Sequence, residues 1–163
     1  MPMKFEGQLA DRGRWRADSC SVAKVLDLLN TKTTFLVLRE CFYGTARFED
    51  FVDRIGTSAP AVSRALKQLE SAQIVSRVPY RTPGARSRNA YELTPAGEDL
   101  LPVLLALTQW GDKHLHNGSA PLVFVTADKG QPVRVRVSSD ADSPDLRADG
   151  IEVRGSFILD EVE

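Results

Sequence analysis

Basic side chains are concentrated in the middle of the chain. Arg64 and Lys67 lie three residues apart. Four arginines follow, with no acidic residue between the first and the last: Arg77, Arg81, Arg86 and Arg88. Guanidinium and ammonium groups bind phosphate oxygens, and arginine also pairs with the edge of guanine. This spacing indicates nucleic-acid binding, provided that the surrounding elements present the cations together.

Residues 58–72 are the first such element and are predicted to form a helix. Ser58 can cap its free amide groups, and Pro60 in the first turn sacrifices no hydrogen bond. Apolar residues at spacings of four and three form the buried stripe: Val62, Leu66 and Leu69. The opposite face has no large apolar side chain and carries Pro60, Arg64, Lys67 and Gln68, with Ser63 on its flank. We therefore expect this face, together with Ser58, to contact DNA.

Residues 74–93 are the second element and read as a hairpin. Alternation over 74–80 and 89–93 predicts two strands, and Thr82-Pro83-Gly84-Ala85 suits a tight turn. Arg81, Arg86 and Arg88 should then contact phosphate or the minor groove. Taken alone, the helix is best interpreted as an ordinary amphipathic helix, and the hairpin as an ordinary solvated hairpin. Their adjacency favours a recognition helix with a wing.

The overall charge of −1 conceals an uneven distribution. Residues 44–91 carry eight basic and four acidic side chains, a net charge of +4, whereas residues 119–163 carry five and nine, a net charge of −4. The local surplus coincides with the predicted helix and hairpin. No apolar run approaches the ~20 residues of a membrane helix, and the N-terminus lacks a signal-peptide core, so a cytoplasmic protein without membrane contacts is expected.

Further helices are predicted around this centre. They cover residues 20–29, 31–43 and 48–55, and Gly44 and Gly56 end the second and third. Gly56-Thr57 is then the turn of a helix-turn-helix. A long helix from Thr94 to Asn117 carries too many leucines for one stripe, so a second copy of the chain should cover its other face. The expected homodimer interface comprises Val22, Val25, Leu29, Leu104, Leu107 and Trp110.

The pattern changes from helix to strand after Ser119. Residues 122–125 and 133–137 are expected to pair as a hairpin, and residues 151–153 and 157–159 supply one or two further strands. The fold class is therefore α+β, mainly α. Three parts are expected: an arm over residues 1–19, a winged helix-turn-helix domain over 20–118 with a long C-terminal dimerisation helix, and a small β appendage over 119–163.

Residues for catalysis or metal binding do not form a recognisable set. No phosphate-binding loop, nucleophile elbow or zinc-protease motif occurs, and His114 and His116 diverge on a helix, so no enzyme, cofactor or metal is expected. Cys20 has two interpretations. A thiol in the first turn of a helix can be activated as a redox sensor, or it can pack inertly at a dimer interface. Cys41 lies within an apolar helix and is expected to pack in the core.

From Cys20 to Leu115 the chain resembles the HxlR-type transcriptional regulators, winged-helix proteins related in shape to the MarR group. The resemblance rests on segments in the family's order and spacing: Cys20-Ser21-Val22-Ala23, Leu38-Arg39-Glu40 with Gly44 and Arg47-Phe48, Val62-Ser63, Leu69-Glu70, Ile74-Val75, Tyr91 to Gly97, Leu101 to Leu104 and Trp110-Gly111. It implies a homodimer joined through the first and last helices of the core and bound to palindromic or direct-repeat DNA near promoters. It also implies that Cys20 occupies the position at which some relatives sense oxidants or electrophiles.

The chain departs from the family pattern at several positions. Ser21 stands where proline is usual, Thr33 where tryptophan is usual, and Gln73 where glycine is usual. Several relatives carry a C-terminal extension that resembles a zinc ribbon, but no cysteine follows Cys41, so zinc is not expected.

The leading hypothesis is thus a homodimeric transcriptional regulator, most simply a repressor, that binds operator DNA and responds to a small molecule or an oxidant. The main alternative is a winged-helix module for protein contacts without specific DNA binding. A small enzyme is a further alternative, disfavoured by the missing constellation of catalytic residues.

Overall fold

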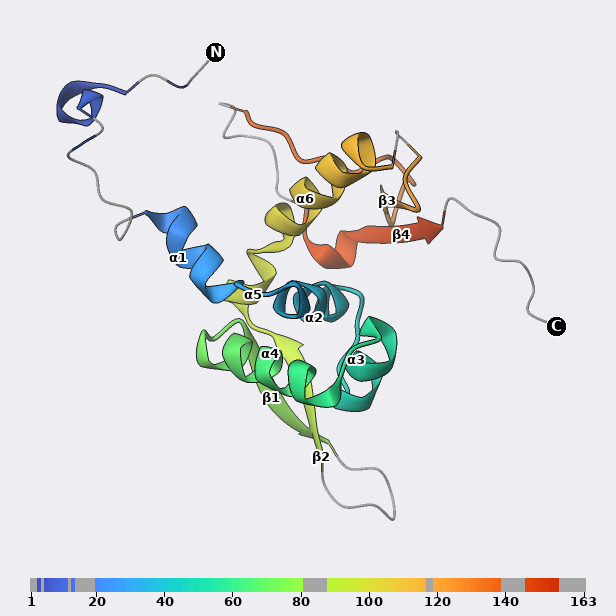
Figure 1. Cartoon of the computed structure of the whole chain (residues 1–163). Coiled ribbons are helices and arrows are strands. Elements are labelled where there is room, and N and C mark those ends of the chain that lie inside the picture. Colours follow the sequence, from blue (N-terminus) through green and yellow to red (C-terminus); the bar gives the residue numbers. More distant parts are fainter. Residues whose placement is uncertain are drawn as a thin grey trace.

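The computed structural model describes residues 3, 5–11, 13, 20–80, 88–116, 119–138 and 146–155 of the 163-residue chain. Within them a short 3-10 turn, η1 (Gly7–Ala10), precedes the helices α1 (Ser21–Leu28), α2 (Lys32–Phe42), α3 (Phe48–Ile55) and α4 (Ala59–Ser71) (Figure 1). A hairpin of β1 (Val75–Tyr80) and β2 (Arg88–Leu93) leads to α5 (Pro95–Glu98) and α6 (Leu101–His114). A second sheet contains β3 (Leu122–Thr126) and β4 (Ile151–Gly155), with the 3-10 turn η4 (Ala148–Gly150) between them in sequence. The predicted α+β, mainly helical winged-helix architecture is confirmed.

Capping residues and glycines set the ends of α2 and α3. The Thr31 hydroxyl accepts a hydrogen bond from the Thr34 amide at 3.1 Å and caps α2. Gly44 and Gly56 have φ angles of 82° and 66°, a left-handed conformation that costs glycine little. Both glycines follow a helix directly or by one residue, as the sequence predicted.

The core lies where α2, α3 and α4 meet the base of the hairpin. Its fully buried large side chains are Val37, Leu38, Phe51, Val62, Leu66, Leu69 and Val75. The α4 members are the stripe predicted from periodicity, so the opposite face of α4 is turned to solvent. Figure 1 shows α4 on the side of the bundle away from α6, with the β1–β2 hairpin extending below.

β1 and β2 pair antiparallel, with Val75 opposite Leu93 and Tyr80 opposite Arg88. Ala46 and Arg47 add one bridge to the outer edge of β2, where the Tyr91 amide donates to the Ala46 carbonyl at 2.8 Å. This bridge anchors the hairpin to the start of α3.

The predicted single helix from Thr94 to Asn117 is wrong in one respect. The chain forms α5, leaves the helix at Asp99 and Leu100, and starts again as α6 with Pro102 in its first turn. Proline fits there because the first amide groups of a helix have no intrahelical acceptor. α6 ends at His114, and Asn117-Gly118, the expected stop, lies outside the described residues.

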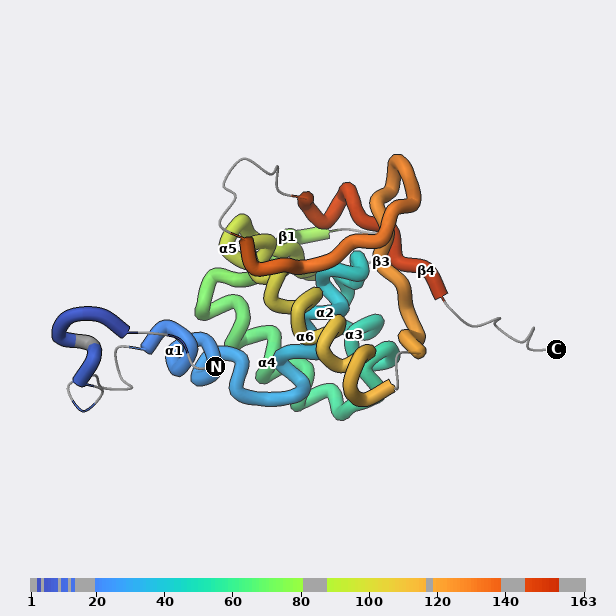
Figure 2. The backbone as a smooth tube through the Cα atoms, turned by 90° about the horizontal axis from the view of Figure 1, so that it is seen from above, coloured from blue at the N-terminus to red at the C-terminus, as the bar shows by residue number. Residues whose placement is uncertain are grey.

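The predicted pairing of residues 122–125 with 133–137 is confirmed only at its start, where Val125 forms an antiparallel bridge with Pro132, and the main partner of β3 is a later segment. β3 pairs antiparallel with β4, with Leu122 opposite Gly155 and Thr126 opposite Ile151. The segment after Pro132 bonds once to β3, from the Val133 amide to the Phe124 carbonyl, and then follows α6, where the Gln109 side chain accepts from the Val135 amide at 2.5 Å. β3 and β4 lie beside α6 in both views (Figures 1 and 2). The expected strand at 157–159 lies outside the described residues.

Candidate nucleic-acid interface

The outer face of α4 carries most of the residues expected to contact DNA. Ser58, Pro60, Arg64 and Lys67 are exposed and Ser63 is half-buried, whereas Val62, Ala65, Leu66 and Leu69 are buried on the other side. Ser58 occupies the N-cap position, but its hydroxyl makes no capping hydrogen bond, contrary to expectation. An exposed Ser58 therefore keeps its hydroxyl free of the helix, and the face presents two cations and small polar groups at helical spacing.

Gln68 does not belong to this outer face. Its amide nitrogen donates to the Leu28 carbonyl at 2.6 Å and approaches the Asn30 side-chain oxygen at 3.3 Å. Gln68 thus ties α4 to the end of α1 and satisfies a free carbonyl there. Its amide donor is thus used within the protein, and its expected contact with DNA stays a prediction.

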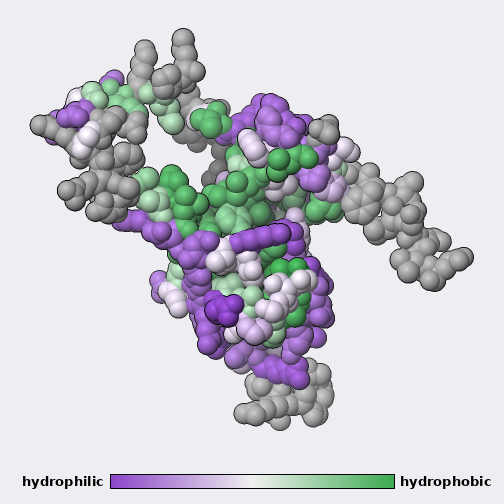
Figure 3. Space-filling view, in the orientation of Figure 1, coloured by the Kyte–Doolittle hydropathy of each residue, from purple (hydrophilic) through white to green (hydrophobic). Residues whose placement is uncertain are grey.

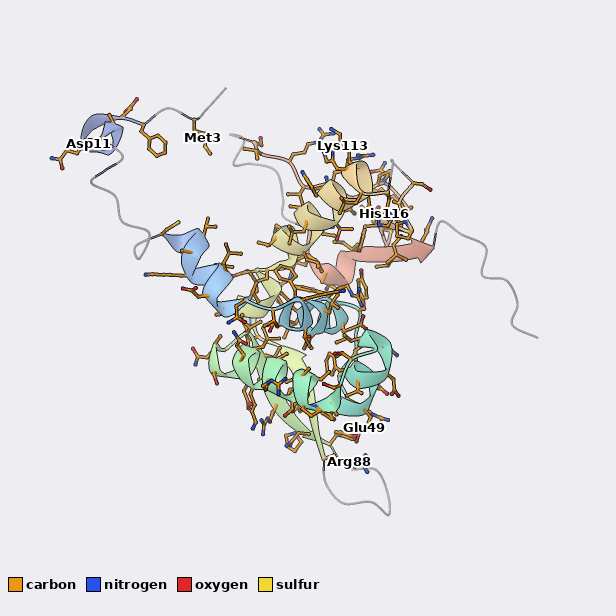
Figure 4. The ribbon with its side chains drawn as sticks, in the orientation of Figure 1. Met3, Asp11, Glu49, Arg88, Lys113 and His116 are labelled. Atoms are coloured by element: carbon orange, nitrogen blue, oxygen red, sulfur yellow. The ribbon has the colours of Figure 1, made fainter. Side chains whose placement is uncertain are left out.

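The wing presents Arg88 beside α3. The Arg88 Nη1 atom lies 2.9 Å from a Glu49 carboxylate oxygen, and both side chains are more than half exposed. Figure 4 shows the two residues together at the wing end of the body. Arg77 makes a more buried pair with Glu70, at 2.8 Å. Arg81 and Arg86, which were expected to contact phosphate, lie outside the described residues.

Arg47 is an additional cation at the wing that was not selected from the sequence. Its guanidinium lies 5.1 Å from the centre of the Tyr80 ring, a cation–π contact at the C-terminal end of β1. Arg47 directly precedes α3 and bridges to Ala90, so it is held on the same side as Arg88. Its place in the basic segment 44–91 was the available signal, but the contact with Tyr80 depends on how the hairpin folds back.

A buried polar network holds α2 and α3 in place behind this face. The Glu40 side chain is almost fully buried, accepts from Arg39 at 2.7 Å and from the Thr45 hydroxyl at 3.0 Å. The Thr45 hydroxyl in turn accepts from Arg54 at 2.9 Å. A buried carboxylate needs such partners, because an unpaired charge in the interior is costly. The network links the end of α2 to the end of α3, immediately before the turn into α4.

The residues expected at a dimer interface divide into two groups. Val22 and Val25 on α1, and Leu107 and Trp110 on α6, are between 40% and 65% exposed. Leu29 is 5% and Leu104 is 6% exposed, so their assignment to the interface is wrong. Leu29 packs in the core, and Leu104 lies beside Phe42 and Phe124, because the appendage covers that side of α6.

The exposed apolar residues instead form stripes on α1 and α6. Val103, Leu107 and Trp110 are spaced by four and three on α6, and Val22, Val25 and Leu26 lie on α1. Figure 3 shows hydrophobic surface over α1 and α6, while the lower part of the body, which carries α3 and α4, is mainly hydrophilic. Apolar and cationic faces therefore occupy different ends of the molecule.

The two cysteines differ in environment. Cys20 is half-buried at the N-cap position of α1, one residue before the helix in which it was expected. Cys41 packs against the core, and burial, together with the neighbouring Glu40 charge, raises the pKa of its thiol to about 12. The expected packing role of Cys41 is confirmed by its contacts.

In the part of the chain that the structure describes, no three His, Cys, Asp or Glu side chains are grouped as metal ligands, and no helix has the length and apolarity to cross a bilayer. His114 stacks against Trp110, with ring centres 5.0 Å apart, and His116 is exposed beyond the end of α6 (Figure 4).

Residues 28–119 match the HxlR-like helix-turn-helix family. An uncharacterized HTH-type transcriptional regulator of Mycobacterium tuberculosis is 36% identical over 106 residues, which is 65% of this chain and 66% of that relative, so the match spans slightly less than two thirds of the relative's length. The crystal structure of PA1607, proposed to be a transcription factor, is 31% identical with a TM-score of 0.68 and covers 78% of this chain and 89% of PA1607. The oxidized form of the redox regulator HypR is 26% identical with a TM-score of 0.52, covering 58% of this chain and 97% of HypR. The chain belongs to the HxlR-like helix-turn-helix family.

Proposed function

We propose that this protein is a homodimeric transcriptional repressor that inserts α4 into the major groove and rests the β1–β2 hairpin on the adjacent backbone. The observation that carries the proposal is the division of α4 into two faces. Val62, Leu66 and Leu69 are buried, and the exposed side offers Arg64 and Lys67 without a large apolar side chain. An α-helix fits the major groove, which is about 12 Å wide.

The cations divide into two roles by position. Arg64 lies near the middle of the α4 outer face, where a guanidinium reaches the edge of guanine. Arg47 and Arg88 lie beside α3, near the end of β1 and the start of β2, where they contact phosphates and add affinity without sequence preference. Arg81 and Arg86, which follow β1 in sequence, are proposed for the same role.

The second half of the proposal is the dimer. A contiguous apolar surface on α1 and α6 is of the kind that monomers avoid in water. A second copy related by a two-fold axis brings the same stripes together and buries them. Because these stripes and α4 lie at different ends of the molecule, both copies of α4 remain free to enter successive major grooves, about 34 Å apart. A dimer fixed to promoter DNA in this way excludes polymerase by occupancy alone, which favours repression.

Cys20 is proposed as the residue through which an oxidant acts. It is half-buried directly before α1, the helix that carries Val22, Val25 and Leu26 of the apolar surface. Oxidation of the thiol to a sulfenic acid places a polar group beside that surface. The redox regulator HypR, which shares the fold, provides a precedent for this class of signal.

The experiment is a titration of DNA binding against salt, using duplexes tiled across the region upstream of the protein's own gene. Footprinting identifies the protected duplex, and log affinity should then fall linearly with log salt concentration, by about 0.9 for each phosphate contact. A double variant, Arg86→Ala with Arg88→Ala, should weaken all duplexes alike and flatten that slope. A module for protein contacts only would give neither a footprint nor a steep salt dependence.

A further inference from the structure

The recognition helix ends in a closed turn that points two carbonyl groups away from the helix. Gln73 has a φ angle of 58°, and its amide donates to the Glu70 carbonyl at 2.9 Å. The Ile74 amide reaches back to the Leu69 carbonyl, also at 2.9 Å. This pair of bonds satisfies the last carbonyls of α4. The carbonyls of Gln73 and Ile74 themselves remain to be bound from outside.

Thr94 binds both of these carbonyls. Its amide donates to the Ile74 carbonyl at 3.0 Å, and its hydroxyl donates to the Gln73 carbonyl at 2.5 Å. The same hydroxyl accepts from the Gly97 amide at 3.2 Å and so caps α5. One side chain therefore joins the end of the recognition helix to the start of α5.

Gly97 brings the two backbones into contact. A Cβ atom at this position would lie 2.2 Å from the Ile74 carbonyl oxygen, and the glycine is buried. Any side chain would push α5 away from the end of α4, so the position requires glycine for lack of space. We refer to Thr94, Gly97 and the carbonyls of Gln73 and Ile74 as the clasp.

α6 continues from α5 through hydrogen bonds. The Leu100 amide donates to the Gly97 carbonyl and the Leu104 amide to the Leu100 carbonyl, both at 3.1 Å. Near its start, Leu101 and Leu104 of α6 line a small cavity together with Phe42 and Tyr43 of α2. Beyond that point α6 rises away from α2–α4 and is accompanied by the appendage (Figure 1). The clasp is thus a direct route by which the direction of α6 is set relative to α4.

We infer that the clasp is a positioning device that sets the separation of the two recognition helices in the dimer and thereby the half-site spacing that the protein accepts. The inference rests on the proposed function, because α6 carries the proposed dimer surface and α4 the proposed reading surface. Thr94 contacts neither DNA nor the partner in this scheme. It acts through the orientation of α6.

The experiment compares Thr94→Val, which keeps the side-chain shape but removes the hydroxyl, with Thr94→Ser, which keeps the hydroxyl. Thr108→Val is the matched control, since the Thr108 hydroxyl donates to the Leu104 carbonyl within α6, at 2.9 Å. Each full-length variant is titrated with the footprinted duplex, with a single half-site, and with duplexes whose half-sites are moved apart by one to three base pairs. Circular dichroism and sedimentation confirm that each variant is folded and dimeric.

Thr94→Val should bind the two-site duplex about tenfold more weakly, while its affinity for a single half-site stays within about twofold of the wild type. The reason is that a misplaced second α4 has a lower effective concentration at the second half-site. The variant should also discriminate less between duplexes with different half-site spacings. Thr94→Ser and Thr108→Val should behave like the wild type. If folded, dimeric Thr94→Val keeps the wild-type ratio and spacing profile, the clasp serves stability alone and the inference is wrong.

A second background covers the possibility that Thr94→Val is too unstable to titrate. Gln73→Gly relieves the left-handed backbone of Gln73 and restores stability without restoring the lost hydroxyl. A spacing defect that persists in Thr94→Val with Gln73→Gly supports positioning, whereas full recovery overturns it. Failure of the proposed function is separately visible, since the wild type would then be monomeric or leave the half-site unbound.

Discussion

Arg88 on the wing is ion-paired with Glu49 in the first turn of α3, with 2.9 Å between nitrogen and oxygen. The pair holds a proposed phosphate ligand at the start of β2, and it also places a carboxylate beside that ligand. An exposed pair of this kind contributes little to stability. Its main effect should be on binding, because Glu49 competes with phosphate for the same guanidinium.

Glu49→Gln should therefore bind duplex DNA more tightly, by about two- to fivefold at low salt, because the competing charge is removed. Fluorescence anisotropy with the footprinted duplex measures the change. Glu152→Gln is the matched control, since Glu152 makes a comparable exposed pair with Arg154 on β4, away from the wing. Weaker binding by Glu49→Gln would show that the pair positions Arg88 for DNA and does not compete with phosphate for it.

Arg64→Ala should lose specific binding by roughly 1–3 kcal/mol while the fold stays intact, since its side chain is exposed on the outer face of α4. Competition between the footprinted duplex and a scrambled duplex separates specific from general affinity. Lys113→Ala removes a cation near the far end of α6 and should change neither (Figure 4). Unchanged specific affinity in folded Arg64→Ala would exclude this residue from sequence reading.

Leu107→Glu should dissociate the dimer. Leu107 is 53% exposed in the middle of the α6 stripe, and two glutamates facing each other across the two-fold axis weaken association on the order of 100-fold. Sedimentation at micromolar concentration should give about twice the 18.0 kDa chain mass for the wild type and about that mass for the variant. Val137→Glu, at a fully exposed appendage residue, should remain dimeric. A monomeric wild type that binds a single half-site tightly would overturn the interface.

The two thiols should react at different rates. Burial raises the pKa of Cys41 to about 12, so at pH 8.5 this thiol stays protonated and its thiolate is roughly a thousandfold scarcer than for an ordinary cysteine. Iodoacetamide at pH 8.5 should therefore label Cys20 first, giving one addition by mass spectrometry in the native protein and two in urea. Equal labelling of both cysteines in the folded protein would contradict the burial of Cys41.

Features that depend on neighbours along the chain were determined by the sequence itself. The buried stripe of α4 follows from helical spacing, and the ends of α2 and α3 follow from glycines that tolerate left-handed backbone. The family pattern was also readable, because its motifs combine local turns and caps. Gln73, noted from the sequence as a departure from glycine, does adopt a left-handed φ angle.

Features that depend on distant segments were decided only by the tertiary structure. Gln68 faces outward by periodicity, yet a carbonyl forty residues earlier takes its amide. Leu104 counts as surplus apolar area until the appendage covers it. Residues 133–137 alternate like a strand, although only the start of this segment bonds to β3 and β4 pairs along the other edge of β3. In each case two partners with similar local preferences compete, and the contact between segments far apart in sequence selects one. The sequence therefore determined the reading head, and tertiary packing decided which surfaces remain for DNA and for a second copy.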